Sequence, residues 1–184
     1  DVRTVTTESG TEVSFDVLGI DVGGVNPAVP ESAVASKPIY RIGDLEPPVR
    51  RTLSDPAASL HLVVVGGGAA GTEVALNLTG RFRGAGRGAD LDLTLVEQAA
   101  QILPGFPAGM RSYAAELLRD RGATLRTGTS VDAVTSETDG ASVRVSTGSN
   151  TADTLAADVV LWATGTVAPP FLQESGLSTD DRGF

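Results

Sequence analysis

A short apolar run that leads into three spaced glycines constrains the fold of this chain more than any other feature. Residues 61–65 (HLVVV) are followed by Gly66, Gly68 and Gly71 in the pattern Gly-x-Gly-x-x-Gly, and a helical pattern begins at once. The first glycine allows a tight strand-to-helix turn, the second lets the backbone approach a phosphate, and the third lets the helix pack closely on the strand. The free N–H groups and the dipole of that helix then attract an anion. The segment therefore predicts a site for the pyrophosphate of a dinucleotide.

An acidic residue at the end of a second strand supports this interpretation. Residues 91–96 (LDLTLV) alternate as a strand does and end at Glu97. A carboxylate at this place accepts hydrogen bonds from an adenosine ribose, although a solvated strand end would look the same in the sequence. Its charge repels the 2′-phosphate of NADPH, and residues 98–100 (QAA) offer no arginine to hold that phosphate. NADH is therefore expected in preference to NADPH.

Composition excludes several other classes of function. The 184 residues contain no cysteine, so the chain has no disulfide framework, no thiolate metal site and no redox-active cysteine pair. A net charge of −9 argues against binding to nucleic acid, and no metal site is expected. No run of apolar residues is long enough for a transmembrane segment. The first residues include neither a methionine nor a signal core, so we expect the chain to be a fragment of something longer.

The order of elements predicts an α/β fold. We expect a Rossmann-like β-α-β parallel sheet with a three-stranded antiparallel flap, because strands alternate with helices before a short meander and a last buried strand. The strands are expected at 61–65, 91–96, 124–126 and 158–162, the helices at 69–82 and 107–121, and the flap at 131–136, 143–146 and 154–155. Trp162 is expected in the core.

The segment before this unit, up to residue 59, combines short strand patterns with a proline-rich stretch. Strands are expected at 2–7 and 12–15, and residues 16–20 (DVLGI) continue as a buried strand. Residues 26–59 contain six prolines and little periodicity, so they predict a surface connector with at most one helical turn, near 42–51. Arg81, Arg83 and Arg87 bracket a glycine-rich loop and are expected to be solvated, with contact to a phosphate or an acceptor partner as the alternative.

Four segments together resemble a known family: 63–73 (VVVGGGAAGTE), 95–97 (LVE), 102–106 (ILPGF) and 157–165 (ADVVLWATG). They are similar to the pyridine nucleotide-disulfide oxidoreductase superfamily of FAD- and NAD(P)-binding flavoproteins. Within it, the chain most resembles the type II NADH dehydrogenases. The likeness extends to a subgroup fused to selenide, water dikinase, in which strings like 15–23 (FDVLGIDVG) occur.

The resemblance implies an NAD-binding domain inserted in an FAD-binding domain. Residues 1–25 would be a fragment of the FAD-binding domain and 26–59 a linker. Residues 60–165 would be the NAD(H)-binding domain, and 166–184 would begin the return to the FAD-binding domain. The chain contains neither a second Gly-x-Gly-x-x-Gly motif for FAD nor the Gly-Asp motif that holds its ribityl chain. FAD is therefore expected in the full-length protein rather than in this chain alone.

The motif and the resemblance together give a set of cofactor-binding residues, and no catalytic residue is assigned. Hydride transfer between nicotinamide and flavin needs stacked rings rather than a side-chain base. Glu73 is expected in the first helical turn, either near the nicotinamide or merely stabilised by the helix dipole. Gly165 lies either against the dinucleotide or in a plain turn. The expected set is Gly66, Gly67, Gly68, Ala69, Ala70, Gly71, Thr72, Glu73, Glu97, Gln98, Val131, Ala163, Thr164 and Gly165.

The expected function is that of the NADH-binding part of an FAD-dependent NADH:acceptor oxidoreductase. The acceptor is not identified by the residues, and a quinone is the type that the resemblance suggests. The isolated fragment is expected to be inactive. A homodimer and a cytoplasmic location, peripheral to a membrane in the full-length protein, are further expectations. An NAD-binding sensor module without catalysis, and a glycine-rich structural domain without a ligand, remain as alternatives.

Overall fold

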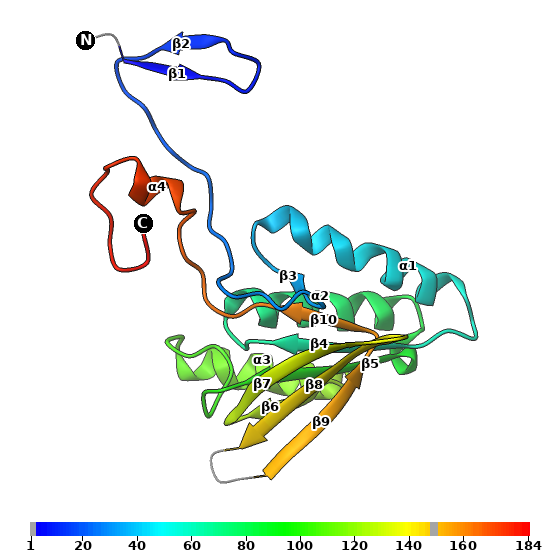
Figure 1. Cartoon of the computed structure of the whole chain (residues 1–184). Coiled ribbons are helices and arrows are strands. Elements are labelled where there is room, and N and C mark those ends of the chain that lie inside the picture. The colour runs from blue at the N-terminus through cyan, green and yellow to red at the C-terminus, as the bar shows by residue number, and fades with distance from the viewer. Residues whose placement is uncertain (1–2, 148–150) are drawn as a thin grey trace.

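A parallel five-stranded sheet lies at the centre of the computed structural model, which describes residues 3–147 and 151–184 (Figure 1). A separate three-stranded antiparallel sheet covers part of it, so the expected α/β class with a flap is confirmed. In order across the central sheet the strands are β3 (Val34–Ala35), β10 (Val159–Trp162), β4 (Leu60–Val65), β5 (Leu91–Glu97) and β6 (Thr124–Thr127). The flap consists of β7 (Thr129–Glu137), β8 (Gly140–Thr147) and β9 (Thr151–Ala157).

The apolar run of β4 is continuous because both faces of this strand are buried. Leu62 and Val64 pack into the layer formed with helices α1 (Glu46–Ser54), α2 (Ala69–Gly84) and α3 (Ala108–Asp120). Val63 and Val65 point the other way and pack against the flap. A parallel strand covered on both faces lacks the polar alternation of a half-exposed strand. The core therefore lies in two layers, with the helices on one face of the sheet and the flap on the other.

The expectation of a connector with little regular structure before β4 is wrong, although residues 42–51, where the sequence predicts a helical turn, are indeed helical. Strand β3 pairs with β10 at the sheet edge, a 3₁₀ helix (η1) spans Ile39–Leu45, and α1 follows it directly. Val49 of α1 is 1% exposed and belongs to the core. Pro47 and Pro48 lie in the first turn of α1, where a missing N–H costs nothing. Two of the six prolines that suggested a loop thus lie at the start of a helix.

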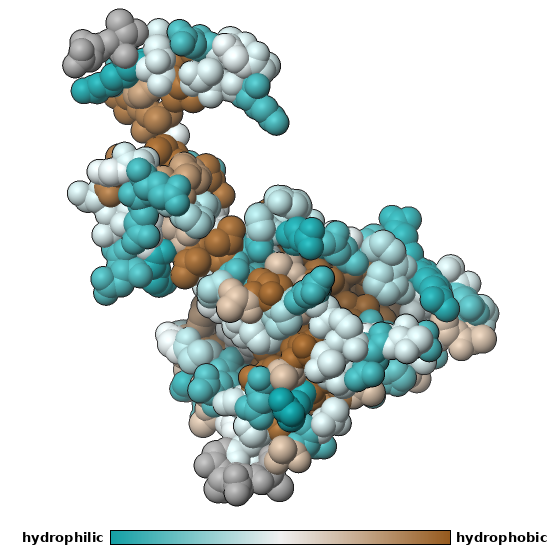
Figure 2. All heavy atoms as spheres, in the orientation of Figure 1, coloured by the Kyte–Doolittle hydropathy of each residue, from teal (hydrophilic) through white to brown (hydrophobic). Residues whose placement is uncertain are grey.

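The expected buried strand over residues 16–20 is also wrong. An antiparallel hairpin precedes it, made of β1 (Thr4–Thr6) and β2 (Glu12–Ser14), while Val2, the expected start, lies outside the described residues. Residues 16–20 form no strand, and Val17 is 88% exposed. Figure 2 shows hydrophobic atoms between the hairpin and the main body, where this segment runs. The apolar pattern is that of a buried strand, but no described residue covers it.

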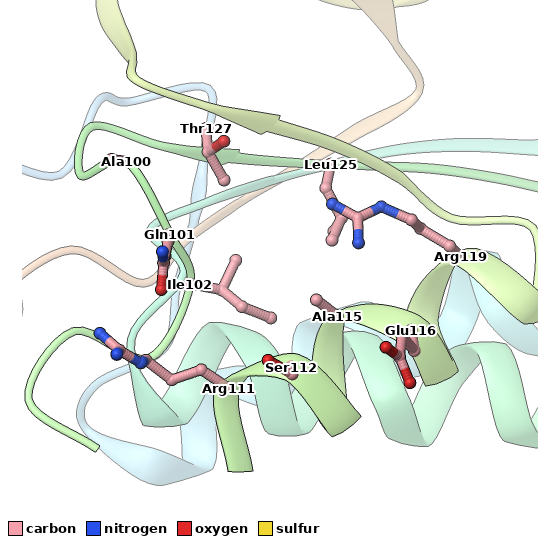
Figure 3. Close-up of a pocket in the computed structure, with 10 residues that line it drawn as sticks. All are labelled: Ala100, Gln101, Ile102, Arg111, Ser112, Ala115, Glu116, Arg119, Leu125 and Thr127. Carbon is pink, nitrogen blue, oxygen red and sulfur yellow. The ribbon is translucent and has the colours of Figure 1, made fainter. Parts of the chain in front are cut away.

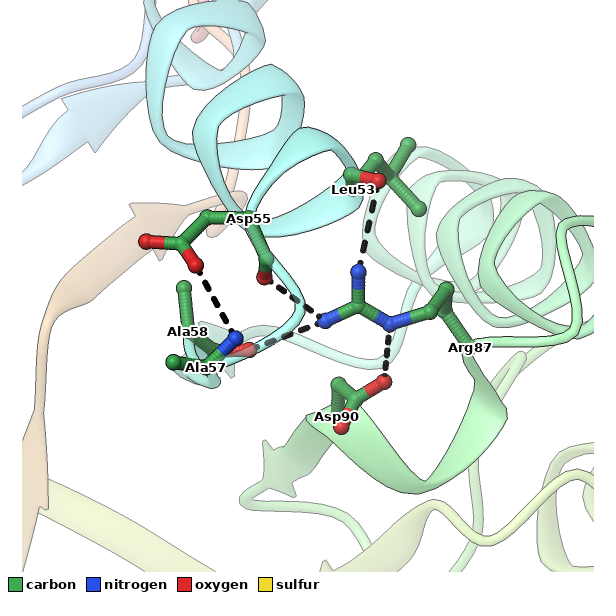
Figure 4. Close-up of polar contacts among 6 residues, drawn as sticks. All are labelled: Leu53, Asp55, Ala57, Ala58, Arg87 and Asp90. Atoms are coloured by element: carbon green, nitrogen blue, oxygen red, sulfur yellow. Dashed lines mark hydrogen bonds and ion pairs between the residues drawn. The ribbon is translucent and has the colours of Figure 1, made fainter.

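Arg87 is not solvated, contrary to expectation, and instead ties three backbone segments together (Figure 4). It lies just before the short 3₁₀ helix η2 (Gly88–Asp90) and pairs with the Asp90 carboxylate. Its guanidinium also donates to the carbonyl oxygens of Leu53 at 3.3 Å, Asp55 at 3.0 Å and Ala58 at 3.2 Å. The side chain therefore joins the end of α1 and the start of β4 to the loop after α2.

Replacing Arg87 by alanine should lower the stability of the domain, although neither Arg87 nor its partners belong to a strand of the sheet. The change leaves three carbonyl groups and the Asp90 carboxylate without their charged donor, which costs about 2 kcal/mol of unfolding free energy. Urea unfolding followed by circular dichroism measures this loss. Arg50→Ala is the matched control, because Arg50 makes only an exposed ion pair with Glu46. Equal stability of the two variants would contradict the role of Arg87 in joining these backbone segments.

Candidate nucleotide-binding site

A groove of about 550 Å³ opens where the parallel strands β4, β5 and β10 end. Ligands of open α/β sheets bind at the carboxyl ends of the strands, and the groove lies at that edge. It brings together more than half of the residues expected to bind the cofactor, from four separate segments of the chain. Those that line it are Gly66, Gly68, Glu97, Gln98, Val131, Ala163, Thr164 and Gly165.

The three glycines of the motif have separate roles, as the spacing predicts. Gly66 has a φ of +104°, and a Cβ there would lie 2.8 Å from the carbonyl oxygen of Ala163. A Cβ at Gly71 would lie 1.9 Å from the carbonyl oxygen of Gly66, so this glycine allows α2 to pack on the turn. At Gly68 no atom lies within 4 Å of the Cβ position. Gly68 therefore keeps space open in the groove, where a ligand would approach the backbone.

The start of α2 offers backbone N–H groups rather than a capping side chain. Its N-cap is Gly68, so no side-chain oxygen takes up the first amides of Ala69 and Ala70. These amides have no partner within the helix, and the positive end of the helix dipole adds to their attraction for an anion. Thr72 is buried and donates its hydroxyl to the carbonyl oxygen of Gly67 at 3.1 Å. It shapes the turn and does not line the groove.

Glu97 is held in position by the turn that it faces. Its Oε2 accepts a hydrogen bond of 2.6 Å from the backbone N–H of Gly67, and its Oε1 accepts one of 2.7 Å from Ala99. The side chain is partly exposed and lines the groove. A carboxylate oxygen accepts more than one hydrogen bond, so each oxygen keeps acceptor capacity for a ligand hydroxyl. The arrangement presents a fixed acceptor pair beside the phosphate-binding turn.

Glu73 lies elsewhere, which corrects one detail of the sequence interpretation. It is the fifth residue of α2 and so belongs to the second turn rather than the first. Its exposed side chain lines a different hollow of about 380 Å³ between α2 and the η1–α1 segment, together with Glu46 and Arg81. There, hydrogen bonds from Arg81 and Arg50 lower the pKa of Glu46 to about 2. Glu73 therefore does not line the groove, and its proximity to a nicotinamide stays a prediction.

Trp162 forms part of the groove as well as part of the core. It packs against the flap-side cluster as expected, and it also lines the groove at the end of β10. Its indole Nε1 is buried and has no hydrogen-bond partner among the described residues. The Trp162 ring thus gives the groove an apolar surface, and its Nε1–H is a hydrogen-bond donor without a partner among the described residues.

Asn26 is a residue of the site that sequence reasoning missed. It is 8% exposed, and its Nδ2 donates to the carbonyl oxygens of Thr164 at 3.1 Å and Gly165 at 2.8 Å. Its Oδ1 accepts from the Ser36 hydroxyl at 3.0 Å and from the Lys37 N–H at 2.7 Å. One amide therefore fixes the Thr164–Gly165 rim of the groove to the segment after β3. No sequence pattern marks this residue, because its partners are far away in the chain.

The fold and the groove agree with the comparison to known families. The model of the pyridine nucleotide-disulphide oxidoreductase family matches residues 2–184. The chain belongs to this family. The expected recognition at the family level is thereby confirmed, whereas the fusion to selenide, water dikinase stays a prediction.

Two curated relatives resemble most of this chain. Demethylphylloquinone reductase NdbB of Synechocystis is 26% identical over 182 residues, which cover 96% of this chain and 43% of the relative. The external alternative NADH-ubiquinone oxidoreductase of Yarrowia lipolytica mitochondria is 29% identical over 187 residues, covering 89% of this chain and 31% of the relative. The chain thus spans less than half the length of these relatives.

Solved structures share the fold of this chain. NDH2 from Plasmodium falciparum in complex with NADH superimposes with a TM-score of 0.70 at 19% identity, over 93% of this chain and 39% of that one. The putidaredoxin reductase–putidaredoxin complex gives a TM-score of 0.68 at 26% identity, over 96% of this chain and 41% of that one. The likeness to NDH2 supports the fold alone.

Proposed function

We propose that this chain is the NADH-binding part of an FAD-dependent NADH:acceptor oxidoreductase. The observation that carries the proposal is the open space at Gly68, which lies between the start of α2 and the fixed carboxylate of Glu97. A pyrophosphate fits against uncapped helix amides, and an adenosine ribose fits against the carboxylate at the end of the neighbouring strand. The names of the relatives, which include an NADH-ubiquinone oxidoreductase, agree with this function.

The residues of this chain bind and orient the nucleotide rather than carry out its chemistry. The N–H groups of the first turn of α2 would hold the pyrophosphate, and Glu97 would accept hydrogen bonds from the ribose. Thr164 and Gly165 form the rim of the groove at the end of β10. NADH held in this groove would be the hydride donor, and FAD bound in the full-length protein would be the acceptor. The role of this domain is therefore to fix the distance and the orientation at which the nicotinamide meets the flavin.

A quinone-type acceptor is part of the proposal. The two curated relatives are named for the reduction of demethylphylloquinone and ubiquinone. No helix in residues 3–147 and 151–184 has both the length and the apolar character needed to cross a bilayer. This chain matches less than half the length of these relatives. We propose that the acceptor meets the flavin in a region of the full-length protein that corresponds to the rest of their length.

A nucleotide titration tests the function directly. Trp162 is the only tryptophan and lines the groove, so energy transfer from it to the reduced nicotinamide reports binding. We expect saturable binding of NADH that is about tenfold or more tighter than that of NADPH, because the Glu97 charge repels a 2′-phosphate. Glu97→Gln should weaken NADH binding and reduce the preference over NADPH.

Gly68→Val should weaken NADH binding by more than about tenfold while the domain stays folded. A Cβ at this position has no neighbouring atom within 4 Å, and the backbone there (φ −69°) suits any residue, so we expect a stability cost of about 1 kcal/mol. The loss would come from the space that the side chain takes from the ligand. Wild-type NADH affinity in Gly68→Val, or equal affinity for NADPH in the unmodified chain, would contradict the assignment.

A further inference from the structure

A second pocket, of about 260 Å³, lies behind the loop that follows Glu97 (Figure 3). Its walls are loop residues 100–102, one face of α3 and strand β6 at the sheet edge. It is smaller than the roughly 300–1,000 Å³ typical of sites for drug-sized ligands, so its ligand would be small. None of the residues that line the nucleotide groove lines this pocket, because the loop separates the two spaces.

Two arginines border this pocket from opposite sides. Arg111 and Arg119 both belong to α3, and Figure 3 shows their guanidinium groups on either side of an apolar floor formed by Ile102 and Ala115. No ion pair is formed by either residue within the part of the chain that the structure describes. Two arginines without an ion pair and one carboxylate, that of Glu116, therefore line this hollow in a chain whose net charge is −9.

The Nε–H group of Arg111 is a further sign that this pocket binds an anion. This atom is buried and has no hydrogen-bond partner among the described residues. A buried donor without an acceptor costs free energy, and the cost is larger for a charged group. Gln101, Ser112 and Thr127 add polar groups to the same walls, while the carboxylate of Glu116 also lines the pocket. The site thus offers charged and neutral donors, and the buried Nε of Arg111 bonds to none of the acceptor oxygens on these walls.

We propose that the pocket between Arg111 and Arg119 binds a phosphate-type oxyanion, either free or as a phosphomonoester. Such an anion supplies the missing acceptor and matches the fork of N–H donors that a guanidinium presents. The proposal goes beyond the nucleotide function and does not depend on it. The two sites nevertheless share a loop, since the N–H of Leu103 donates to the carbonyl oxygen of Gly67 at 2.6 Å. An anion in the pocket therefore braces the loop that also supports the phosphate-binding turn.

Nuclear magnetic resonance of the ¹⁵N-labelled chain tests the proposal with sodium phosphate as the probe. Sodium chloride at matched ionic strength controls for screening. We expect saturable shifts of the Arg111 Nε–H signal and of the amides of Gln101 and Ser112. Saturable shifts confined to the amides of residues 66–71 would place phosphate in the nucleotide groove and overturn the proposal. Shifts that do not saturate, or no shifts at all, would overturn it too.

Charge-removing variants give an independent test. Arg111→Gln and Arg119→Gln should each weaken phosphate binding by about tenfold, because each removes one of the two positive charges that border the pocket. Arg119 is exposed, so its replacement should not affect folding. Arg144→Gln, an exposed arginine of β8, is the matched control and should bind as the unmodified chain does. Unchanged affinity in both α3 variants would overturn the proposal.

A parallel titration with glycerol phosphate distinguishes the two sources of the anion. Tighter binding of the ester than of inorganic phosphate would indicate an organic phosphate as the ligand, and weaker binding would indicate free phosphate. Because the readout is the set of residues whose signals shift, it separates this proposal from the nucleotide function. A chain that fails to bind NADH would still report on the arginine pocket.

Discussion

Gly71→Ala is expected to destabilise the domain by about 3 kcal/mol or more, although it adds a single methyl group. The added Cβ would lie 1.9 Å from the carbonyl oxygen of Gly66 and 3.3 Å from the Cβ of Ala163. Neither neighbour is the flexible end of a side chain, so the start of α2 must move away from the turn. The N–H groups that face the groove would move with it. NADH affinity should therefore fall together with stability.

Thermal and urea unfolding measure the loss in stability, and the tryptophan titration measures the loss in affinity. Gly84→Ala is the matched control, because Gly84 ends the same helix and its Cβ position meets no atom within 4 Å. That variant should be as stable as the unmodified chain or up to about 1 kcal/mol more stable. Gly68→Val completes the comparison, since it should lose affinity without a comparable loss of stability. A Gly71→Ala variant with unmodified stability would contradict the close packing of helix and strand.

The central unit could be predicted from the sequence because its signals are local. The apolar run of β4, the glycines after it and the acid at the end of β5 each depend on neighbours within a few residues. The pattern gave the helices α2 and α3 to within two residues at each end. The groove residues at the ends of β4 and β5 followed from the same pattern, since parallel strands bring their carboxyl ends to one edge.

The sequence could not predict contacts that join distant segments. Strand β3 has two residues and is defined by its pairing with β10, more than a hundred positions later. The role of Arg87 depends on three carbonyl groups that any sequence would supply. The segment 16–20 shows the opposite failure, because its apolar pattern predicts a partner that the described residues do not contain. In each case the sequence does not tell which distant segment of the chain packs against the residue or strand in question.

Asn26 is the strongest example, and its replacement should have the second large effect. Asn26→Leu removes four hydrogen bonds and leaves the carbonyl oxygens of Thr164 and Gly165, the Ser36 hydroxyl and the Lys37 N–H without this partner. Unpaired buried polar groups cost about 1–3 kcal/mol each, and some of these can turn to water. We therefore expect a loss of about 3 kcal/mol or more in unfolding free energy.

A second variant separates the effect on the groove from the effect on stability. Asn26→Asp keeps the acceptor for Lys37 and Ser36 but turns a carboxylate oxygen toward the carbonyl oxygens of Thr164 and Gly165. These two residues form the rim of the groove, so repulsion there should weaken NADH binding. Ser36→Ala is the control, because it removes one bond on the other side of the amide and should cost only about 1 kcal/mol. NADH affinity should fall in Asn26→Asp and stay unchanged in Ser36→Ala. If both variants bind NADH equally well, the amide of Asn26 stabilises the fold without positioning the groove.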